Sequence, residues 1–207
     1  WSVSTAYQMK QDGNYFWLEL TGLTPQKEYA FQYMVVRSDG VVKKISDLHS
    51  EKALHKDDQW EPMKVDPTLM DYPSQGDGYV TVIQTAKPEY QWSDATLNFK
   101  RPNKNNLVIY EAWVYDHTVT RDIKGMTDRM FYYEDMGVNA IELMPIQEFD
   151  GNKNWGYSPN HYFALDKAYG TPEQMKTFID ECHKRGIAVI LDMVFNHATG
   201  LNPMNKL

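Results

Sequence analysis

Residues 187–197 read Ile-Ala-Val-Ile-Leu-Asp-Met-Val-Phe-Asn-His, an apolar strand that runs directly into a polar tip. A strand that is apolar throughout is typical of a parallel sheet covered by helices on both faces. Two similar apolar segments precede it, at 107–111 and 140–144, and helical patterns separate the three, at 126–137 and 171–186. The order strand-helix-strand-helix-strand predicts a parallel sheet in the C-terminal half.

The length of this half limits the fold. A (β/α)8 TIM barrel needs about 250 residues, or roughly 31 for each unit. Residues 106–207 would therefore hold the first three units of a barrel, cut after the third strand. The alternative is a small open doubly wound sheet. No glycine-rich phosphate loop follows the first strand, so the sequence does not support a nucleotide site.

The N-terminal half has a different pattern, with aromatic, strand-prone segments separated by turns. These segments are 15–20, 29–36 and 41–45. We interpret 1–48 as part of an all-β immunoglobulin-like sandwich, which needs roughly seven strands, with Tyr29 as the corner tyrosine whose hydroxyl bonds back to the backbone. Residues 49–105 are expected to be a connector with a strand near 79–85. Its apolar side chains are expected to dock on a neighbouring part: Trp60, Met63, Leu69, Met70 and Tyr72.

Composition excludes several classes of function. The 207 residues contain 21 Lys and Arg against 28 Asp and Glu, a formal net charge of −7. This acidic balance, with no long basic cluster, argues against nucleic acid or an anionic membrane surface as a partner. No apolar run of about 18 residues is present, so we expect no membrane span. Cys182 is the single cysteine, which excludes an internal disulfide. The chain opens on Trp1, and we expect a piece of a longer protein.

Polar side chains follow each of the three predicted parallel strands. The first strand leads into Asp116 and His117, the second into Glu148, and the third into 192–197. Sites in barrels and in open α/β sheets form at the carboxyl ends of the strands. The second strand also leads into a long loop, 149–170, and long loops are uncommon unless they are functional. This loop carries an aromatic set suited to stacking on sugar rings: Trp155, Tyr157, His161, Tyr162 and Phe163.

Several of these segments resemble the α-amylase superfamily, glycoside hydrolase family 13. Residues 192–197 are similar to its third-strand D-x-V-x-N-H pattern, and 154–159, Asn-Trp-Gly-Tyr-Ser-Pro, to the N-W-G-Y-x-P loop of its branching and debranching members. Residues 137–145 and 169–173 also match, in the family's order. The resemblance implies a TIM barrel, preceded by an immunoglobulin-like or starch-binding-type module.

The resemblance also implies substrate-binding roles for three residues. Tyr157 would be the platform under the sugar ring at the cleavage subsite, and His197 a hydrogen-bond donor to that sugar. Asp192 would hold an arginine expected on the next strand. Asn196 corresponds to a calcium ligand in many amylases, and calcium prefers oxygen ligands. We expect no required cofactor, with Ca²⁺ confined to a full-length parent.

The family's catalytic carboxylates come from the fourth and fifth strands, with a further aspartate after the seventh. We therefore expect no catalytic residue in this chain. Asp116 and Glu148 lie at the predicted rim, but the family does not use these positions as its acid pair, and a motif needs its context.

The sequence thus predicts the N-terminal part of a retaining glycoside hydrolase or related transglycosylase that acts on α-glucans such as starch, glycogen or maltodextrin. Residues 1–207 alone should be inactive. Two alternatives remain open: a non-catalytic α-glucan-binding or structural relative, and an unrelated small α/β domain. We favour a secreted, periplasmic or cell-surface location over the cytoplasm.

Overall fold

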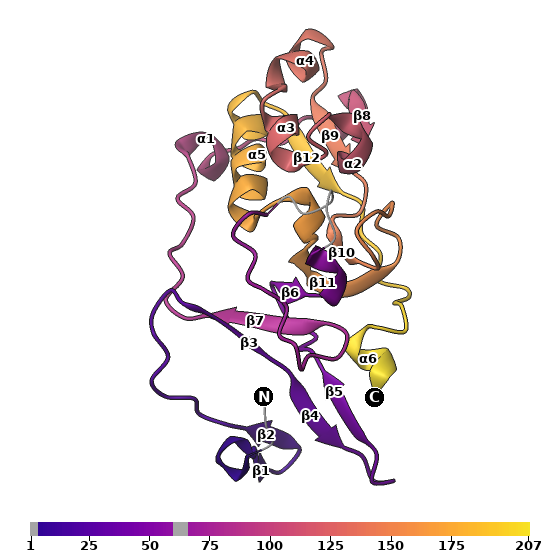
Figure 1. The fold of residues 1–207 in the computed structure, drawn as a ribbon. Coiled ribbons are helices and arrows are strands. Elements are labelled where there is room, and N and C mark those ends of the chain that lie inside the picture. Colours follow the sequence, from indigo (N-terminus) through magenta and orange to yellow (C-terminus); the bar gives the residue numbers. More distant parts are fainter. Residues whose placement is uncertain (1–3, 60–65) are drawn as a thin grey trace.

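The computed structural model describes residues 4–59 and 66–207 (Figure 1). Trp60 and Met63, which the sequence analysis expected to dock on a neighbouring part, lie outside the described residues. A helical and parallel-strand part, with α4 at its tip, lies at one end of the molecule, and the N-terminal strands lie at the other. Within the part that the structure describes, no helix combines the length and apolar character needed to cross a membrane.

Three parallel strands form the sheet of the C-terminal half: β8 (Ile109–Ala112), β9 (Ala140–Leu143) and β12 (Ala188–Leu191). β9 lies in the middle, and its four residues pair one to one with those of each neighbour. The predicted strands and their parallel arrangement are confirmed. The segments that follow the three strands therefore leave the sheet at the same edge.

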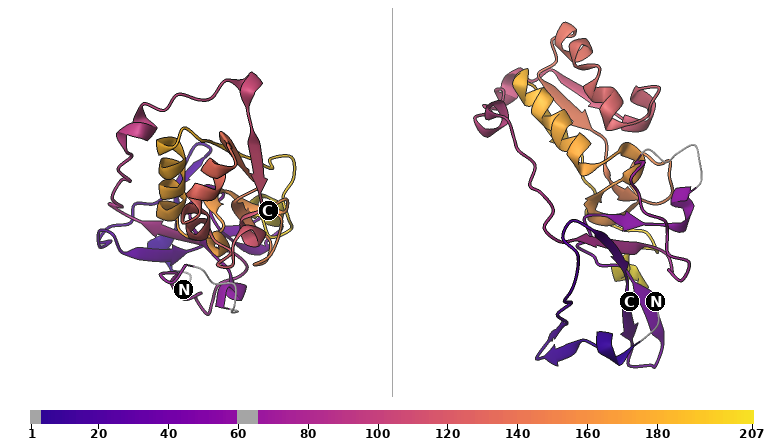
Figure 2. Two further views of the ribbon diagram at one scale, coloured as in Figure 1. Left: turned by 90° about the horizontal axis from the view of Figure 1, so that it is seen from above. Right: turned by 60° about the vertical axis from the view of Figure 1, so that its left-hand side comes forward.

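Helices cover one face of this sheet, and the longest, α5 (Pro172–Lys184), lies along it in Figure 2. Thr171 and Gln174 form the expected capping box at its start, with Pro172 in the first turn. The single helix expected over 126–137 is instead two short ones, because Arg129 leaves the helical conformation (φ −112°, ψ 21°). The short helices are α2 (Val114–His117), α3 (Ile123–Thr127) and α4 (Met130–Asp135). Between helices and sheet lies the larger core: Met126, Met130, Tyr133, Ile141, Leu143, Phe178, Cys182 and Ile187.

The N-terminal half contains three small antiparallel sheets rather than one continuous layer. Two are hairpins, β1–β2 (Lys10–Asp12 with Tyr15–Trp17) and β4–β5 (Tyr33–Val36 with Val42–Ile45). The third has the order β3-β7-β6, with strands Glu28–Phe31, Val80–Gln84 and Ala53–Leu54. The strand expected near 79–85 therefore exists, and it is the central strand of this sheet.

Local contacts explain the N-terminal strands. The Tyr29 hydroxyl accepts a hydrogen bond from the Thr24 backbone N–H at 2.9 Å, which confirms the predicted corner bond. The strand expected over 29–36 is split at Gln32, whose side-chain amide donates to the carbonyls of Asp77 and Tyr79. Part of the connector docks as expected, because Leu69 is buried in the small core under β7, with Met70 and Tyr72 packed against it.

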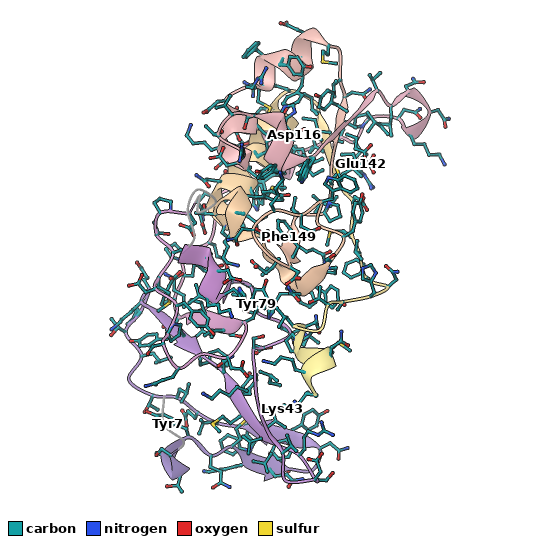
Figure 3. The ribbon with its side chains drawn as sticks, turned by 45° about the vertical axis from the view of Figure 1, so that its right-hand side comes forward. Tyr7, Lys43, Tyr79, Asp116, Glu142 and Phe149 are labelled. Atoms are coloured by element: carbon teal, nitrogen blue, oxygen red, sulfur yellow. The ribbon has the colours of Figure 1, made fainter. Side chains whose placement is uncertain are left out.

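An additional hairpin joins the two halves. It consists of β10 (Gln147–Phe149) and β11 (Pro159–Leu165), within the long loop after β9. The buried Tyr79 of the N-terminal half donates its hydroxyl to the Phe149 carbonyl at 2.9 Å, and Figure 3 shows the two residues next to each other. Ser46 and the buried His161 make a second link, with 2.8 Å between the hydroxyl and Nε2.

A buried ion cluster lies beside this junction. Lys167 pairs with Glu148 of β10, and its Nζ lies 3.2 Å from Asp58 Oδ1 of the N-terminal half. Burial, opposed by the charge of Lys167, raises the pKa of Glu148 well above its usual range and that of the neighbouring Asp166 to about 6. Among the described residues, the cation of Lys167 alone pairs with this buried acidic group, which spans both halves.

Replacing this cation tests the cluster. Lys167→Met should lower the free energy of unfolding by about 3–5 kcal/mol near pH 7.5, because it leaves buried carboxylates without a partner. The loss should be smaller near pH 5. Carboxyls whose folded pKa is raised bind more protons in the folded state, so their contribution falls as pH rises through the window from about 4 to 6 and above.

Chemical denaturation at the two pH values measures this difference. Lys124→Met is the control, since Lys124 pairs with Asp128 at the surface and exposed pairs contribute about 1 kcal/mol or less. Equal destabilisation of Lys167→Met at both pH values would contradict the protonation argument.

Candidate functional site

The candidate site lies at the edge where the three parallel strands end. The Tyr157 hydroxyl donates to Asp192 Oδ2 at 2.6 Å, and His197 Nε2 lies 2.7 Å from the Tyr157 carbonyl oxygen. The structure therefore brings together the three residues that the sequence analysis expected to bind substrate. Their roles toward a sugar stay predictions.

The direction of the His197 contact follows from its partner. A carbonyl oxygen only accepts, so Nε2 carries the proton and Nδ1 of the neutral ring is left as an acceptor. The predicted donor role of His197 toward a sugar then requires a second proton on the ring, or rotation of the ring away from Tyr157.

Glycine at 156 allows the loop to place Tyr157 in this position. Gly156 has φ +93°, and a Cβ built on it would lie 2.1 Å from the Pro145 carbonyl oxygen. Its N–H donates to Asn154 Oδ1 at 2.9 Å, which closes a tight local turn. The loop backbone can pack against the end of β9 only because this residue has no side chain.

Gln147, the first residue of β10, holds the surrounding segments together. Its side chain is buried, with 2% exposed, and its Oε1 accepts from the Val194 N–H at 3.2 Å. Its Nε2 donates to the Tyr162 carbonyl at 3.1 Å, and the Tyr162 hydroxyl donates to the His197 carbonyl at 3.2 Å. Gln147 thus ties the segment after β12 to β11. This role was not predicted from the sequence, where the available signal was an amide side chain directly after the apolar Pro145 and Ile146.

The electrostatic surroundings of the site are acidic. The hydrogen bond to Asp192, with burial and the charges of Asp192, Glu111 and Glu142, raises the pKa of Tyr157 to about 12. Tyr157 therefore stays protonated and donates at neutral pH. Glu111 and Glu142 lie opposite each other on β8 and β9. Among the described residues, none of these three carboxylates makes an ion pair with a cation, so Asp192 is available for a further donor.

Other predicted rim residues lie elsewhere. Glu148 belongs to the buried ion cluster, while Asp116 is exposed at the surface. His117 Nε2 lies 2.7 Å from the Tyr133 hydroxyl, and the two rings stack, so this histidine packs in the core. Asn196 is exposed, and the described residues contain no group of three or more His, Cys, Asp or Glu side chains that could hold a metal ion.

The Gly156 geometry gives a direct test of the loop. Gly156→Ala should lower the free energy of unfolding by about 1 kcal/mol or more, because it adds a backbone clash to an unfavourable φ. Gly151→Ala is the matched control: it has φ +76°, but a Cβ there meets nothing within 4 Å. Thermal unfolding of both variants checks this, and an equal loss in the two would show that the approach to Pro145 is unimportant.

The family model for the α-amylase catalytic domain matches residues 89–203. Malto-oligosyltrehalose trehalohydrolase of Saccharolobus solfataricus is 36% identical over 132 residues, which are 64% of this chain and 23% of that relative. The 1,4-alpha-glucan branching enzyme GlgB 2 of Xanthomonas oryzae pv. oryzae is 34% identical over 145 residues, 66% of this chain and 20% of the relative. The chain thus spans less than a quarter of the length of these curated relatives.

A solved structure supports the same relationship. A Salmonella typhimurium protein assigned as an alpha amylase superposes with a TM-score of 0.67 at 27% identity, covering 92% of this chain and 28% of that one. The fold is therefore that of the α-amylase TIM-barrel superfamily, and the alternatives of an open doubly wound sheet and of an unrelated α/β domain are wrong. Because the family model covers more than half of the chain, this protein belongs to the α-amylase family, glycoside hydrolase family 13.

Proposed function

We propose that the chain forms one side of the substrate cleft of an α-glucan-active enzyme, a retaining glycoside hydrolase or a related transglycosylase. One observation carries the proposal: Tyr157 is hydrogen-bonded to both Asp192 and His197 at the carboxyl edge of the sheet. The names of the relatives, a trehalohydrolase of malto-oligosyltrehalose and a 1,4-alpha-glucan branching enzyme, support α-glucan as the substrate class.

Each residue has a separate task in this proposal. Tyr157 is 37% exposed while its hydroxyl donates to Asp192, so we assign its ring face, rather than its oxygen, to contact with a sugar. Asp192 fixes the tilt of that ring and keeps one oxygen for a donor from the remainder of a barrel. His197 accepts a hydrogen bond from a sugar hydroxyl at its Nδ1 atom.

Cleavage of a glycosidic bond needs functional groups beyond these three residues. A retaining mechanism requires two carboxylates about 5–5.5 Å apart, one nucleophile and one acid/base. We assign neither role to any described residue. Calcium at Asn196 stays a prediction of the resemblance, because calcium takes 6–8 oxygen ligands and Asn196 supplies one. The N-terminal strands are proposed to belong to an immunoglobulin-like module, supported by the Tyr29 corner bond.

Binding of a malto-oligosaccharide tests the site. Tyr157→Ala should weaken the Kd for maltoheptaose roughly tenfold, about 1.4 kcal/mol, because it removes the stacking face. Tyr157→Phe should stay within about threefold of the unchanged chain, since the ring is kept. Isothermal titration calorimetry measures these affinities.

Phe131→Ala is the control, since Phe131 is exposed at 62% and belongs to α4, outside the loop 149–170. It should leave the affinity unchanged. If Tyr157→Ala lowers the melting temperature of the protein as well as its affinity for maltoheptaose, Tyr157 is a packing residue instead.

The absence of assigned catalytic carboxylates gives a second expectation. The purified 207-residue chain should bind α-glucan without cleaving it. Incubation with starch and with pullulan, followed by a reducing-sugar assay, measures cleavage. Appreciable sugar release that follows the protein through purification would overturn this expectation.

A further inference from the structure

A second aromatic surface lies beside the proposed site. Trp155 precedes Tyr157 by two residues and is 62% exposed, although it contacts the Trp113 ring. Two residues span at most about 7 Å along the chain. The partner of Trp155, Trp113, follows β8, and the partner of Tyr157, Asp192, follows β12, so both rings lie along the same edge of the sheet.

The indole of Trp155 contacts the ring of Trp113. The Trp113 ring packs edge-on against it, with the ring centroids 6.4 Å apart and the planes at 88°. Trp113 Nε1 donates to the Asn154 carbonyl and to the Tyr169 hydroxyl, both at 3.0 Å. The backbone just before Trp155 and the Trp113 ring that contacts it are thus both held by hydrogen bonds.

Two cations complete this group, which we call the Trp155 cluster: Trp113, Tyr115, Arg121, Lys153 and Trp155. Tyr115 stacks on Trp113 at 5.0 Å, and the cationic groups of Arg121 and Lys153 lie 4.6 and 4.8 Å from the Tyr115 ring centroid. Arg121 also donates to the Tyr115 hydroxyl at 2.7 Å. Within 4–59 and 66–207 neither cation forms an ion pair, and the Lys153 ammonium makes no hydrogen bond, so its donors are available to a ligand.

This combination of groups suits a carbohydrate. The C–H face of a sugar ring is apolar and packs on an aromatic surface, while its hydroxyls accept hydrogen bonds. The rings of Trp113 and Tyr115 already stack on each other, and Trp155 contacts only the edge of this pair. Packing within the cluster therefore does not explain why the Trp155 indole is exposed to solvent.

We propose that Trp155 is a second stacking platform, which binds a glucose residue of the same α-glucan chain that contacts Tyr157, with Lys153 donating to the hydroxyls of that residue. The inference deepens the proposed function and rests on it for the identity of the ligand. It also implies that affinity depends on the length of the oligosaccharide, because a ligand that reaches only Tyr157 makes no contact with the Trp155 cluster.

Ligands of two lengths test the proposal on the full 207-residue chain. Trp155→Ala should weaken the Kd for maltoheptaose roughly tenfold and leave binding of glucose, followed by NMR chemical shifts, within about twofold. Trp155→Phe, which keeps a ring, should lose less than about threefold, and Lys153→Met about threefold. Phe131→Ala is the matched control, because Phe131 of α4 is also 62% exposed, and it should change neither affinity.

The outcomes separate this inference from the proposed function. If Tyr157→Ala weakens maltoheptaose binding and Trp155→Ala does not, the platform is overturned and the proposed function stands. If Trp155→Ala alone weakens it, the role of Tyr157 fails, and with it the proposal that one glucan chain contacts both rings. If the unchanged chain binds no maltoheptaose, or if Trp155→Ala weakens glucose as much as maltoheptaose, the second platform is overturned.

Discussion

The parallel pairing of β8, β9 and β12 is the constraint on which the site depends. Because β9 pairs in register with both neighbours, the segments that follow all three strands emerge at one edge. Hydrogen bonds continue the order beyond the strands: the Asp192 N–H donates to the Leu143 carbonyl, and the Met144 N–H to that of Ala112. A change of register would move these tips relative to one another and separate the groups at the site.

Beyond the strand ends, the site is built from backbone contacts and buried amides. Tyr157 is placed by the approach of Gly156 to Pro145 and then fixed by Asp192, while Gln147 connects β11 to the segment after β12. The Tyr157 hydroxyl and both polar atoms of the Gln147 side chain are already partnered within the chain. Tyr157 nevertheless stays partly exposed and Trp155 largely so, which leaves aromatic surface open to a ligand.

How far the sequence predicts this structure depends on the range of the interactions. The three parallel strands and the tip 192–197 are local patterns, and both were predicted. The pairing of β7 with β3 was not, since a non-local antiparallel pair leaves no mark on a single segment. The Lys167 cluster was not predicted for the same reason, since Asp58 and Glu148 are far apart in the chain. In the sequence each is a charged residue of the kind that usually lies at the surface, and only the fold buries them. Trp155 was recognised as one of several loop aromatics, but its exposure could come only from the structure.

The charges on the two sides of this loop constrain the kind of ligand. Around Tyr157 the nearby charges are carboxylates, those of Asp192, Glu111 and Glu142. In the Trp155 cluster they are the cations of Arg121 and Lys153, which lie over the Tyr115 ring. An anionic ligand that spans both rings would be repelled at the first, and a cationic ligand at the second. A neutral ligand with many hydroxyls meets no such penalty, because each hydroxyl donates to a carboxylate and accepts from an ammonium or guanidinium group. The opposite charges near the two rings therefore favour an uncharged sugar chain on physical grounds that do not depend on the family.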